Sequence, residues 1–367
     1  MKNQKKSGHP SRKKSALDIT LGGVSVGQRA LLARHLAIML KAGLSLTEAL
    51  HIAQDSAVGK MKLILDDIFR SVTSGRSFVD TLADHKKEFS ELFVSAVRAG
   101  EVSGTLEQNL EHLALQLEKD KDLSSKVKGA LLYPMIVLIA TFILGMVIAF
   151  YVLPQIVPLF IGLKVSLPIT TQILIAFSRL IEQSGGTVFA GIVFFVIAAL
   201  WLVRQRFIKP YTHWILLHAP LAGPLARATN LARFSRTLGM LLKSGLRIDE
   251  AMAIMKEILG NVYYQRVIIE LERRVTKGST MYENLQRYPQ LFPLVAVHMV
   301  RVGEESGRLE DTLLYLGEYY ENEVDSAIKN LSTVIEPLLL LFIGGAVGFL
   351  ALSIITPIYS ITGGVHK

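Results

Sequence analysis

An internal duplication with a period of about 200 residues is the feature that most constrains this chain. The stretch RHLAIMLKAGLSLTEAL at 34–50 returns as RTLGMLLKSGLRIDEAM at 236–252. After a shift of one residue, the two copies stay in register through the pairs Gly75/Gly278, Phe89/Phe292, Gly100/Gly303, Glu101/Glu304, Ser103/Ser306, Gly104/Gly307, Glu107/Glu310 and Pro134/Pro337. Each copy ends at a proline near the start of an uncharged apolar run, which predicts a repeated soluble unit that leads twice into a membrane.

Three tracts, 129–163, 183–203 and 337–365, contain no Asp, Glu, Lys or Arg. A helix of about 20 apolar residues crosses a bilayer, so each tract is long enough to span one. The mean hydropathy of +0.39, with half of the residues hydrophobic, agrees with this interpretation. We predict transmembrane helices at 129–153, 185–203 and 334–360.

The first 26 residues form a basic tail without the apolar core of a cleavable signal peptide. Its positive charges are Lys2, Lys5, Lys6, Arg12, Lys13 and Lys14. We expect a disordered tail that stays in the cytoplasm. The tail supplies six positive charges toward the net charge of +9, and we interpret the rest as serving attraction to anionic lipid headgroups. No direct nucleic-acid partner is expected. Cysteine is absent, which excludes disulfides and zinc sites built from thiolates.

The distribution of Lys and Arg beside the tracts predicts the orientation of the chain. The flanking positive residues are Lys126, Lys128, Arg204, Arg206, Lys209 and Lys329. Two domains, 27–128 and 204–333, are therefore expected in the cytoplasm, with a connector at 154–184 and a tail at 361–367 outside. In the connector, the helical spacing of Ile169, Ile173, Phe177 and Leu180 suggests an amphipathic helix on the membrane surface, although a buried or unstructured loop fits nearly as well.

Both cytoplasmic copies read as all-helical, because apolar residues recur every three to four positions. Leu32, Leu36, Met39 and Leu40 are expected to form the inner face of the first helix. Ser45 and Glu48 form a capping-box pattern for the next helix, whereas the second copy has Arg247 before Glu250. Structural turn positions are predicted at Gly43, Gly100, Gly104, Gly245, Gly303, Gly307, Pro134 and Pro337, the prolines lying where a helix starts and tolerates them best.

The motif RAGEVSGTLE at 98–107 returns as RVGEESGRLE at 301–310. The spacing of its glycines favours a tight helix–turn–helix, and this local role alone would explain the motif. The alternative is a surface on which Glu101 and Glu304 bind an Arg or Lys of another protein. We take Glu48, Glu101, Glu250 and Glu304 as candidates for a cap or a partner contact.

Motifs for catalysis are missing from the sequence: no phosphate-binding loop, HExxH zinc motif, nucleophile elbow or dinucleotide fingerprint occurs. The histidines are scattered, and the acidic pairs lack the spacing of a calcium loop. The predicted spans carry no interior charge, which disfavours solute transport. No catalytic residue, cofactor or metal site is predicted, and the protein is expected not to be an enzyme.

The two motifs, occurring twice and each followed by a proline near the start of a span, resemble the F-type platform proteins of type II secretion, type IV pilus and competence systems. The resemblance covers roughly residues 29–360. It implies two six-helix cytoplasmic bundles, three transmembrane helices, oligomerisation, and residence in the inner or cytoplasmic membrane. It also implies a role that couples a cytoplasmic hexameric assembly ATPase to pilin or pseudopilin subunits, beside other membrane components of the machine and lipid. A passive scaffold or a small transporter are the alternatives.

Overall fold

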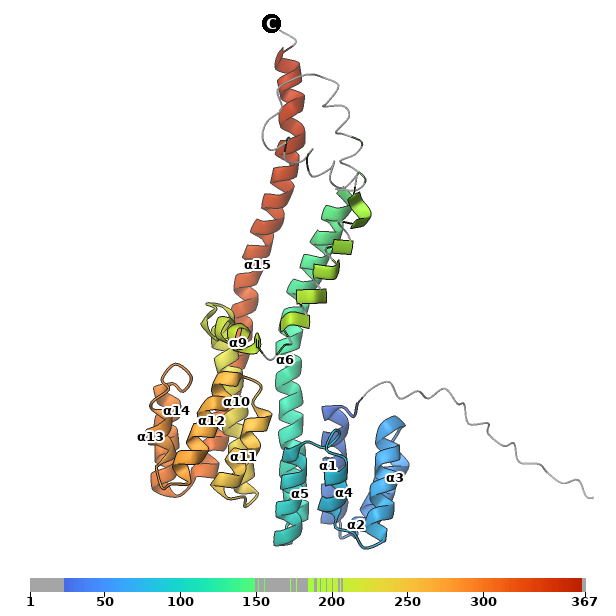
Figure 1. Cartoon of the computed structure of the whole chain (residues 1–367), viewed down its shortest axis with the longest axis vertical. Helices are drawn as coiled ribbons and strands as arrows, with labels where there is room; N and C mark the ends of the chain where they lie inside the picture. Colours follow the sequence, from blue (N-terminus) through green and yellow to red (C-terminus); the bar gives the residue numbers. More distant parts are fainter. Residues whose placement is uncertain are drawn as a thin grey trace, which may run out of the picture. The chain divides into compact units, whose positions relative to one another are not determined.

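The computed structural model describes residues 23–148 and 207–364, with scattered residues between 151 and 205. Within these residues the secondary structure is helical throughout, without a strand (Figure 1), as the sequence predicts. The chain divides into two compact units, Met1–Lys121 with Met240–Arg247, and Asp122–Gly239 with Ile248–Lys367. The predicted tail lies mostly outside the described residues.

The first unit is built from consecutive helices, and the first five pack in order, each against its neighbour in the chain. They are α1 (Val26–Lys41), α2 (Leu46–Ser56), α3 (Gly59–Thr73), α4 (Phe78–Asp84), α5 (Glu91–Ser103) and the first turns of α6 (Leu106–Val147). Its core contains the fully buried rings of Phe78, Phe89 and Phe93. The rings of Phe89 and Phe93 have centroids 4.8 Å apart, a distance at which aromatic rings attract one another.

The inner face of α1 differs in part from the expected one. Leu32 and Leu36 are buried as predicted, but Met39 and Leu40 are only partly covered. Small side chains supply the rest of the buried face, namely Ala30, Ala33 and Ala37. An alanine face lets neighbouring helices approach closely, and a pattern of large apolar residues does not reveal it.

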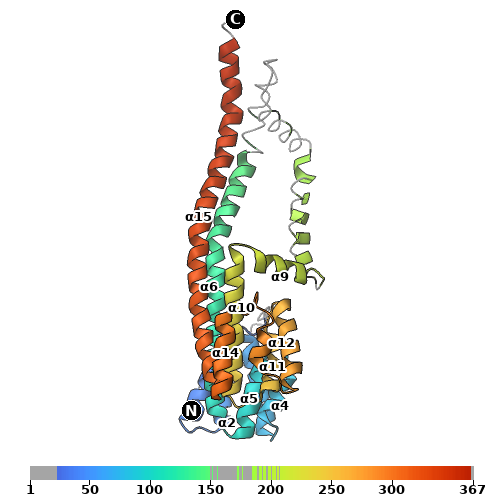
Figure 2. The same ribbon diagram turned by 90° about the vertical axis from the view of Figure 1, so that its left-hand side faces the viewer.

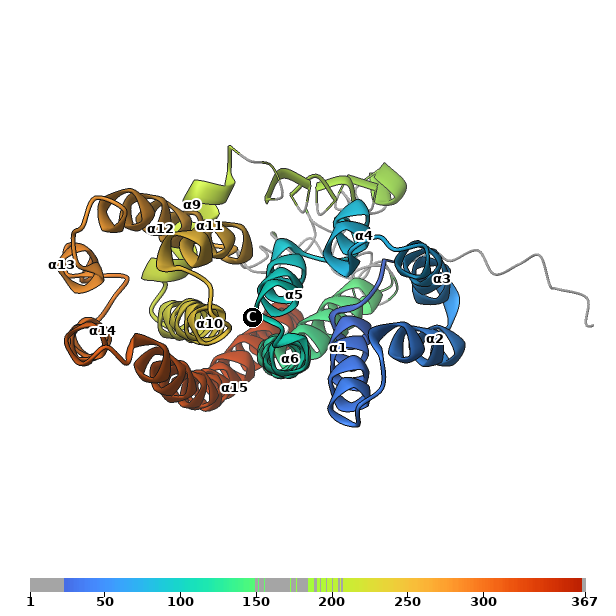
Figure 3. The same ribbon diagram turned by 90° about the horizontal axis from the view of Figure 1, so that it is seen from below.

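The second unit repeats this arrangement with one helix added in front. It contains α9 (Lys209–His218), α10 (Ala222–Lys243) as far as Gly239, α11 (Ile248–Ile258), α12 (Val262–Val275), α13 (Met281–Leu285), α14 (Leu294–Ser306) and α15 (Leu309–Gly364). Seen from below in Figure 3, α10 to α15 follow one another around the bundle. Phe292 lies at the centre, with its ring centroid 5.3 Å from that of Phe234 and 5.5 Å from that of Tyr264. Burial raises the pKa of the Tyr264 hydroxyl, which donates to the carbonyl of Leu291.

Helix α9 is held on the second unit by one buried leucine and one histidine. Pro210 stands in its first turn, where proline costs no hydrogen bond. The side chain of Leu217 is buried, and Nδ1 of His213 accepts the backbone N–H of Val262 at 3.2 Å. That N–H lies in the first turn of α12, where backbone donors have no partner within the helix. The sequence predicted this segment as part of the second bundle, but not as a separate helix.

Acidification is expected to loosen α9, because His213 must be neutral to accept this hydrogen bond. Burial and the nearby charge of Lys209 lower the pKa of His213 below its usual 6.5. The folded protein therefore binds fewer protons than the unfolded chain, and the contribution of His213 is complete above about pH 6.5 and decreases below it. After correction for intrinsic exchange rates, hydrogen exchange of a peptide that contains Val262 should become faster as the pH is lowered from about 7 to about 5. His213→Gln, whose amide oxygen accepts without titrating, should remove this pH dependence; its persistence would contradict the assignment.

Helices α6 and α15 leave their bundles and continue without a break, and both are long and apolar enough to cross a membrane (Figure 2). The last buried side chain of α6 is Leu123 and that of α15 is Leu331 among the residues whose burial is described. The apolar side chains that follow are exposed along both helices, as expected for helices that lipid would cover. The second predicted span is described only in part, as the short apolar helix Val193–Val203. The connector residues Ile169, Ile173, Phe177 and Leu180 lie outside the described residues.

The prediction that Pro134 and Pro337 lie at the start of a helix is wrong. Pro134 lies inside α6 and Pro337 inside α15, far from the first turn of either helix, and neither marks a turn. Proline lacks the N–H that would bond the carbonyl four residues earlier, so each helix loses one internal hydrogen bond at this point. A helix in lipid is favoured over any other backbone because its remaining N–H groups stay bonded. The helix therefore continues through the proline.

Candidate functional site

The carboxylate of Glu101 caps the short helix α4 from the neighbouring helix α5. Its Oε1 accepts the backbone N–H of Phe78 at 3.3 Å, and its Oε2 accepts that of Val79 at 3.2 Å. The hydroxyl of Ser77 also donates to Oε2, at 3.1 Å. A negative charge at a helix N-terminus satisfies free N–H groups and interacts favourably with the helix dipole. Glu101 therefore joins α5 to α4, by a contact with Phe78, which lies 23 residues earlier in the sequence.

Glu304 makes the same connection in the second copy. Its Oε1 accepts the N–H of Met281 at 2.6 Å, and its Oε2 accepts that of Tyr282 at 2.9 Å, at the start of α13. The structure thus places both carboxylates on donors of their own bundle. Each is a cap for the short fourth helix of its copy, and not for the helix that follows it in sequence.

Next to these carboxylates, two glycines let the helix that carries the glutamate approach the long helix that follows. A Cβ atom on Gly100 would lie 2.7 Å from Cα of Leu106, and one on Gly303 would lie 3.0 Å from Cα of Leu309. Real Cβ atoms essentially never come as close as 2.7 Å, so Gly100 requires glycine, whereas a side chain at Gly303 would need its neighbours to shift slightly. Gly104 and Gly307 instead have positive φ values of 71° and 67° and end α5 and α14.

An arginine–glutamate pair ties the first long helix of each bundle to its membrane helix. Arg34 of α1 forms two hydrogen bonds to Glu118 of α6, at 3.1 and 2.6 Å. Arg236 of α10 pairs with Glu321 of α15 in the same way. The hydrogen bonds to Glu118 raise the pKa of Arg34, so its positive charge is secure at every physiological pH. Charge-assisted pairs of this kind are the stronger class of protein hydrogen bonds.

The second pair is more deeply buried than the first. The side chains of Arg236 and Glu321 are 13% and 15% exposed, whereas those of Arg34 and Glu118 are 29% and 40% exposed. Gly317 explains the closer approach, since a Cβ added to it would lie 3.0 Å from the backbone nitrogen of Arg236. The second copy therefore fastens α15 to its bundle more tightly than the first fastens α6.

The remaining candidates lie at local turns and caps. Ser45 and Glu48 form a reciprocal capping box, with the Glu48 carboxylate accepting the Ser45 N–H at 2.9 Å. Hydrogen bonds from Ser45 lower the pKa of Glu48. Glu250 lies in the first turn of α11, and Gly43 and Gly245 have positive φ values of 87° and 85°. These residues shape each copy but are not brought together with Glu101 or Glu304.

Sequence reasoning missed the arginine–glutamate pairs. The repeat places Arg34 and Arg236 at equivalent positions, but no partner was predicted for either. Glu118 and Glu321 are also in register, offset by 203 residues like the other late pairs of the repeat. The recurrence of this arginine and this glutamate at equivalent positions of both copies was the signal from which the pair could have been predicted.

The described residues hold no group of three or more His, Asp or Glu side chains close enough to bind a metal ion. What they do contain, in each copy, is a bundle tied by an arginine–glutamate pair to one long helix that enters the apolar region. Such an arrangement is suited to transmitting displacement or torque from the bundle to the membrane helix.

Comparison with known proteins gives a consistent result for both copies. The family described as type II secretion system (T2SS), protein F, matches residues 32–154 and again 234–357. The type IV pilus assembly protein PilC of Myxococcus xanthus is 34% identical over 361 residues, which cover 97% of this chain and 86% of the relative. PilC of Thermus thermophilus is 35% identical, covering 93% and 84%. Type II secretion system protein F of Pseudomonas aeruginosa is 32% identical, covering 92% and 84%.

Proposed function

Because the chain belongs to the type II secretion system protein F family, we propose that it is the membrane platform of a pilus or secretion machine and couples a cytoplasmic assembly ATPase to insertion of pilin or pseudopilin subunits into a filament. The family is a structural component of such machinery. No catalytic step is assigned to the chain, and its contribution to filament growth is mechanical.

The observation that carries this proposal is the continuity of α6 and α15 from bundle to apolar segment. In each copy the same helix contributes side chains to the buried core and then presents an exposed apolar surface. The pairs Arg34–Glu118 and Arg236–Glu321 fix the bundle end of each helix. A displacement of the bundle would therefore move the membrane helix with it.

The two apolar helices and the family identify an inner-membrane protein. We assign it three passes, with the second at 185–203, and both bundles in the cytoplasm. The Lys and Arg residues beside the spans support this orientation. The cytoplasmic bundles would then be accessible to a hexameric ATPase, and the spans to pilin-like subunits and other membrane components. Oligomerisation of the platform is part of the proposal, with Gly344, Gly345, Ala346 and Gly348 as a candidate packing face.

Cross-linking in native membranes tests the coupling. The tagged chain is cross-linked briefly, purified in mild detergent, and its partners and cross-linked sites are identified by mass spectrometry, with and without ATP hydrolysis. We expect a hexameric ATPase and a pilin-like subunit, and cytoplasmic cross-links that change with hydrolysis. Unchanged cross-links would instead support a fixed scaffold, and solute flux in proteoliposomes would support the transporter alternative.

A further inference from the structure

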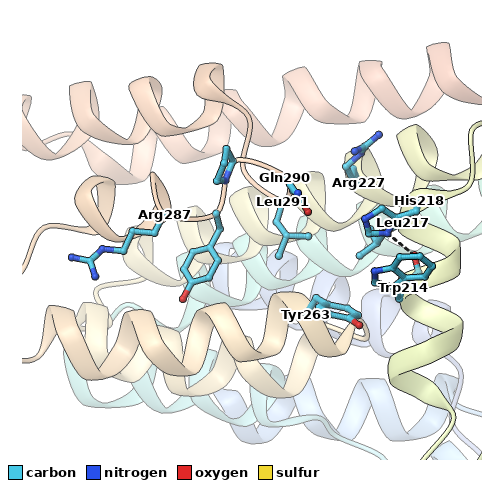
Figure 4. Close-up of a pocket in the computed structure, with 10 residues that line it drawn as sticks. Trp214, Leu217, His218, Arg227, Tyr263, Arg287, Gln290 and Leu291 are labelled. Carbon is cyan, nitrogen blue, oxygen red and sulfur yellow. Dashed lines mark hydrogen bonds between the residues drawn. The ribbon is translucent and has the colours of Figure 1, made fainter.

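A pocket of about 630 Å³ opens in the second unit beside α9. Figure 4 shows that its wall combines side chains from α9, α10, the start of α12 and the segment 287–291. The residues that line it include Trp214, His218, Arg227, Tyr263 and Leu291. The volume is that of a small-molecule site, and the wall is largely aromatic and aliphatic with a few polar groups.

The polar groups of the pocket suit an anion. The rings of Trp214 and His218 stack with centroids 4.4 Å apart, and Nδ1 of His218 donates to the Trp214 carbonyl at 2.9 Å, which fixes this aromatic wall. Arg227 is half-buried and, in the described part of the chain, has no ion pair or hydrogen bond. Arg287 points away from these groups (Figure 4).

The carboxylate bonded to the wall residue Tyr288 is already neutralised. Glu270 accepts the hydroxyl of Tyr288 and pairs with Arg274. These hydrogen bonds lower the pKa of Glu270, which holds it as the charged partner of Arg274. Arg227 is therefore the charge that the pocket presents to a ligand.

The first copy closes the corresponding position. Lys60 and Glu88 stand where the second copy has Tyr263 and Leu291, and their side chains form an ion pair at 2.6 Å. Hydrogen bonding to Lys60 lowers the pKa of Glu88, so the pair is charged. The same bundle fold is thus compatible with a filled wall, and the open aromatic pocket is a property of the second copy alone among the described bundles.

The surroundings of the pocket are those of a membrane interface. Helix α9 begins six residues after the apolar helix Val193–Val203 and exposes Tyr211, Trp214 and Ile215. Tyrosine and tryptophan concentrate at the level of lipid headgroups. The whole stretch 183–248 contains no Asp or Glu, but eight Lys and Arg residues. Such a basic juxtamembrane segment attracts anionic lipid.

We propose that this pocket binds the phosphodiester headgroup of an anionic membrane phospholipid. The phosphate lies against Arg227, and the glycerol and upper acyl chain lie against Trp214 and Tyr263. Bound lipid would hold α9, and with it the second bundle, at the membrane surface. Inorganic phosphate could use the arginine but would gain nothing from the aromatic wall.

The test uses full-length protein in mild detergent with Trp201→Phe, which leaves Trp214 as the one tryptophan. Its fluorescence is titrated with short-chain phosphatidylglycerol, short-chain phosphatidylcholine and inorganic phosphate. We expect saturable binding of phosphatidylglycerol, at least about 10-fold tighter than that of the other two. Equal binding of the two lipids would overturn the proposal. Binding of inorganic phosphate as tight as that of phosphatidylglycerol would identify a soluble-anion site and overturn the lipid assignment.

Two variants and a control locate the binding. Tyr263→Lys with Leu291→Glu installs the ion pair by which the first copy closes this position, and Arg227→Gln removes the charge. Each should weaken phosphatidylglycerol binding by about 10-fold or more while leaving the melting temperature close to that of the parent. Arg308→Gln, an exposed arginine in the turn between α14 and α15, should bind like the parent. Unchanged binding by folded Arg227→Gln and by the double variant would overturn the site.

Discussion

Replacing Gly100 by valine should lower the free energy of unfolding of the first bundle by about 3 kcal/mol. The added Cβ would lie 2.7 Å from the backbone of Leu106 and 3.2 Å from Cβ of Asn109, so α5 and α6 must separate. For a bundle of this size, the change corresponds to a fall of roughly 10 to 20 °C in the melting temperature. Thermal unfolding of the full-length protein in mild detergent, followed by circular dichroism, measures it.

Gly303→Val should have a smaller effect on the second bundle, because its nearest backbone contact is 3.0 Å. Gly129→Val is the control, since a Cβ there would meet no atom within 4 Å and the residue lies in the same helix α6. Melting of Gly100→Val at the temperature of the Gly129→Val control would show that α5 and α6 do not approach closely.

Removing Arg236 should destabilise the second bundle by about 2 to 4 kcal/mol. Arg236→Ala leaves the carboxylate of Glu321, only 15% exposed, without its arginine. Breaking a charge-assisted hydrogen bond between two largely buried side chains costs more than losing a surface ion pair. The same substitution at Arg34, whose partner Glu118 is 40% exposed, should cost about 1 kcal/mol or less. The two copies therefore provide a matched comparison within one chain.

A double substitution separates charge from packing at this position. Arg236→Met combined with Glu321→Leu removes both charges and keeps apolar volume, so its melting temperature should return close to that of the wild type. Chemical denaturation with a single reporter in the second bundle gives the same ranking independently of heat. Equal melting of Arg236→Ala and Arg34→Ala would contradict the difference in burial.

The caps formed by Glu101 and Glu304 change how a partner-contact experiment is interpreted. Glu101→Lys or Glu304→Lys would place a positive charge on the N-terminal donors of α4 or α13 and so damage the bundle itself. Loss of filaments in such variants therefore reports on folding as well as on binding. A contact with the ATPase is better sought at exposed residues that make no cap.

Much of the fold follows from sequence because the duplication repeats its local signals. Gly104 and Gly307 end equivalent helices, and Ser45 with Glu48 begins another. These features act within a few residues, so their pattern is visible in the sequence. The class of the protein follows from the same repeated motifs, and the family comparison confirms it.

The features that the sequence could not predict are contacts between distant elements. The backbone N–H groups that donate to Glu304 lie 22 and 23 residues away, on a helix too short to show a periodic pattern. The pocket beside α9 likewise requires four segments, α9, α10, α12 and 287–291, to meet. Pro134 was misjudged because local propensity disfavours proline in a helix, whereas an apolar environment favours continuing it.

We propose that α6 and α15 act as rigid helices that transmit motion from each bundle to the membrane. Four flexible residues, Gly-Ser-Gly-Ser, inserted after Lys128 of α6 would break this connection; seven helix-forming residues inserted there, about two turns, would preserve it. Counting filaments per cell by electron microscopy, with membrane insertion and protein level checked, gives the result. We predict near-complete loss of filaments with the flexible insertion and substantial retention with the helical one. Equal filament numbers for the two insertions would contradict mechanical coupling through this helix.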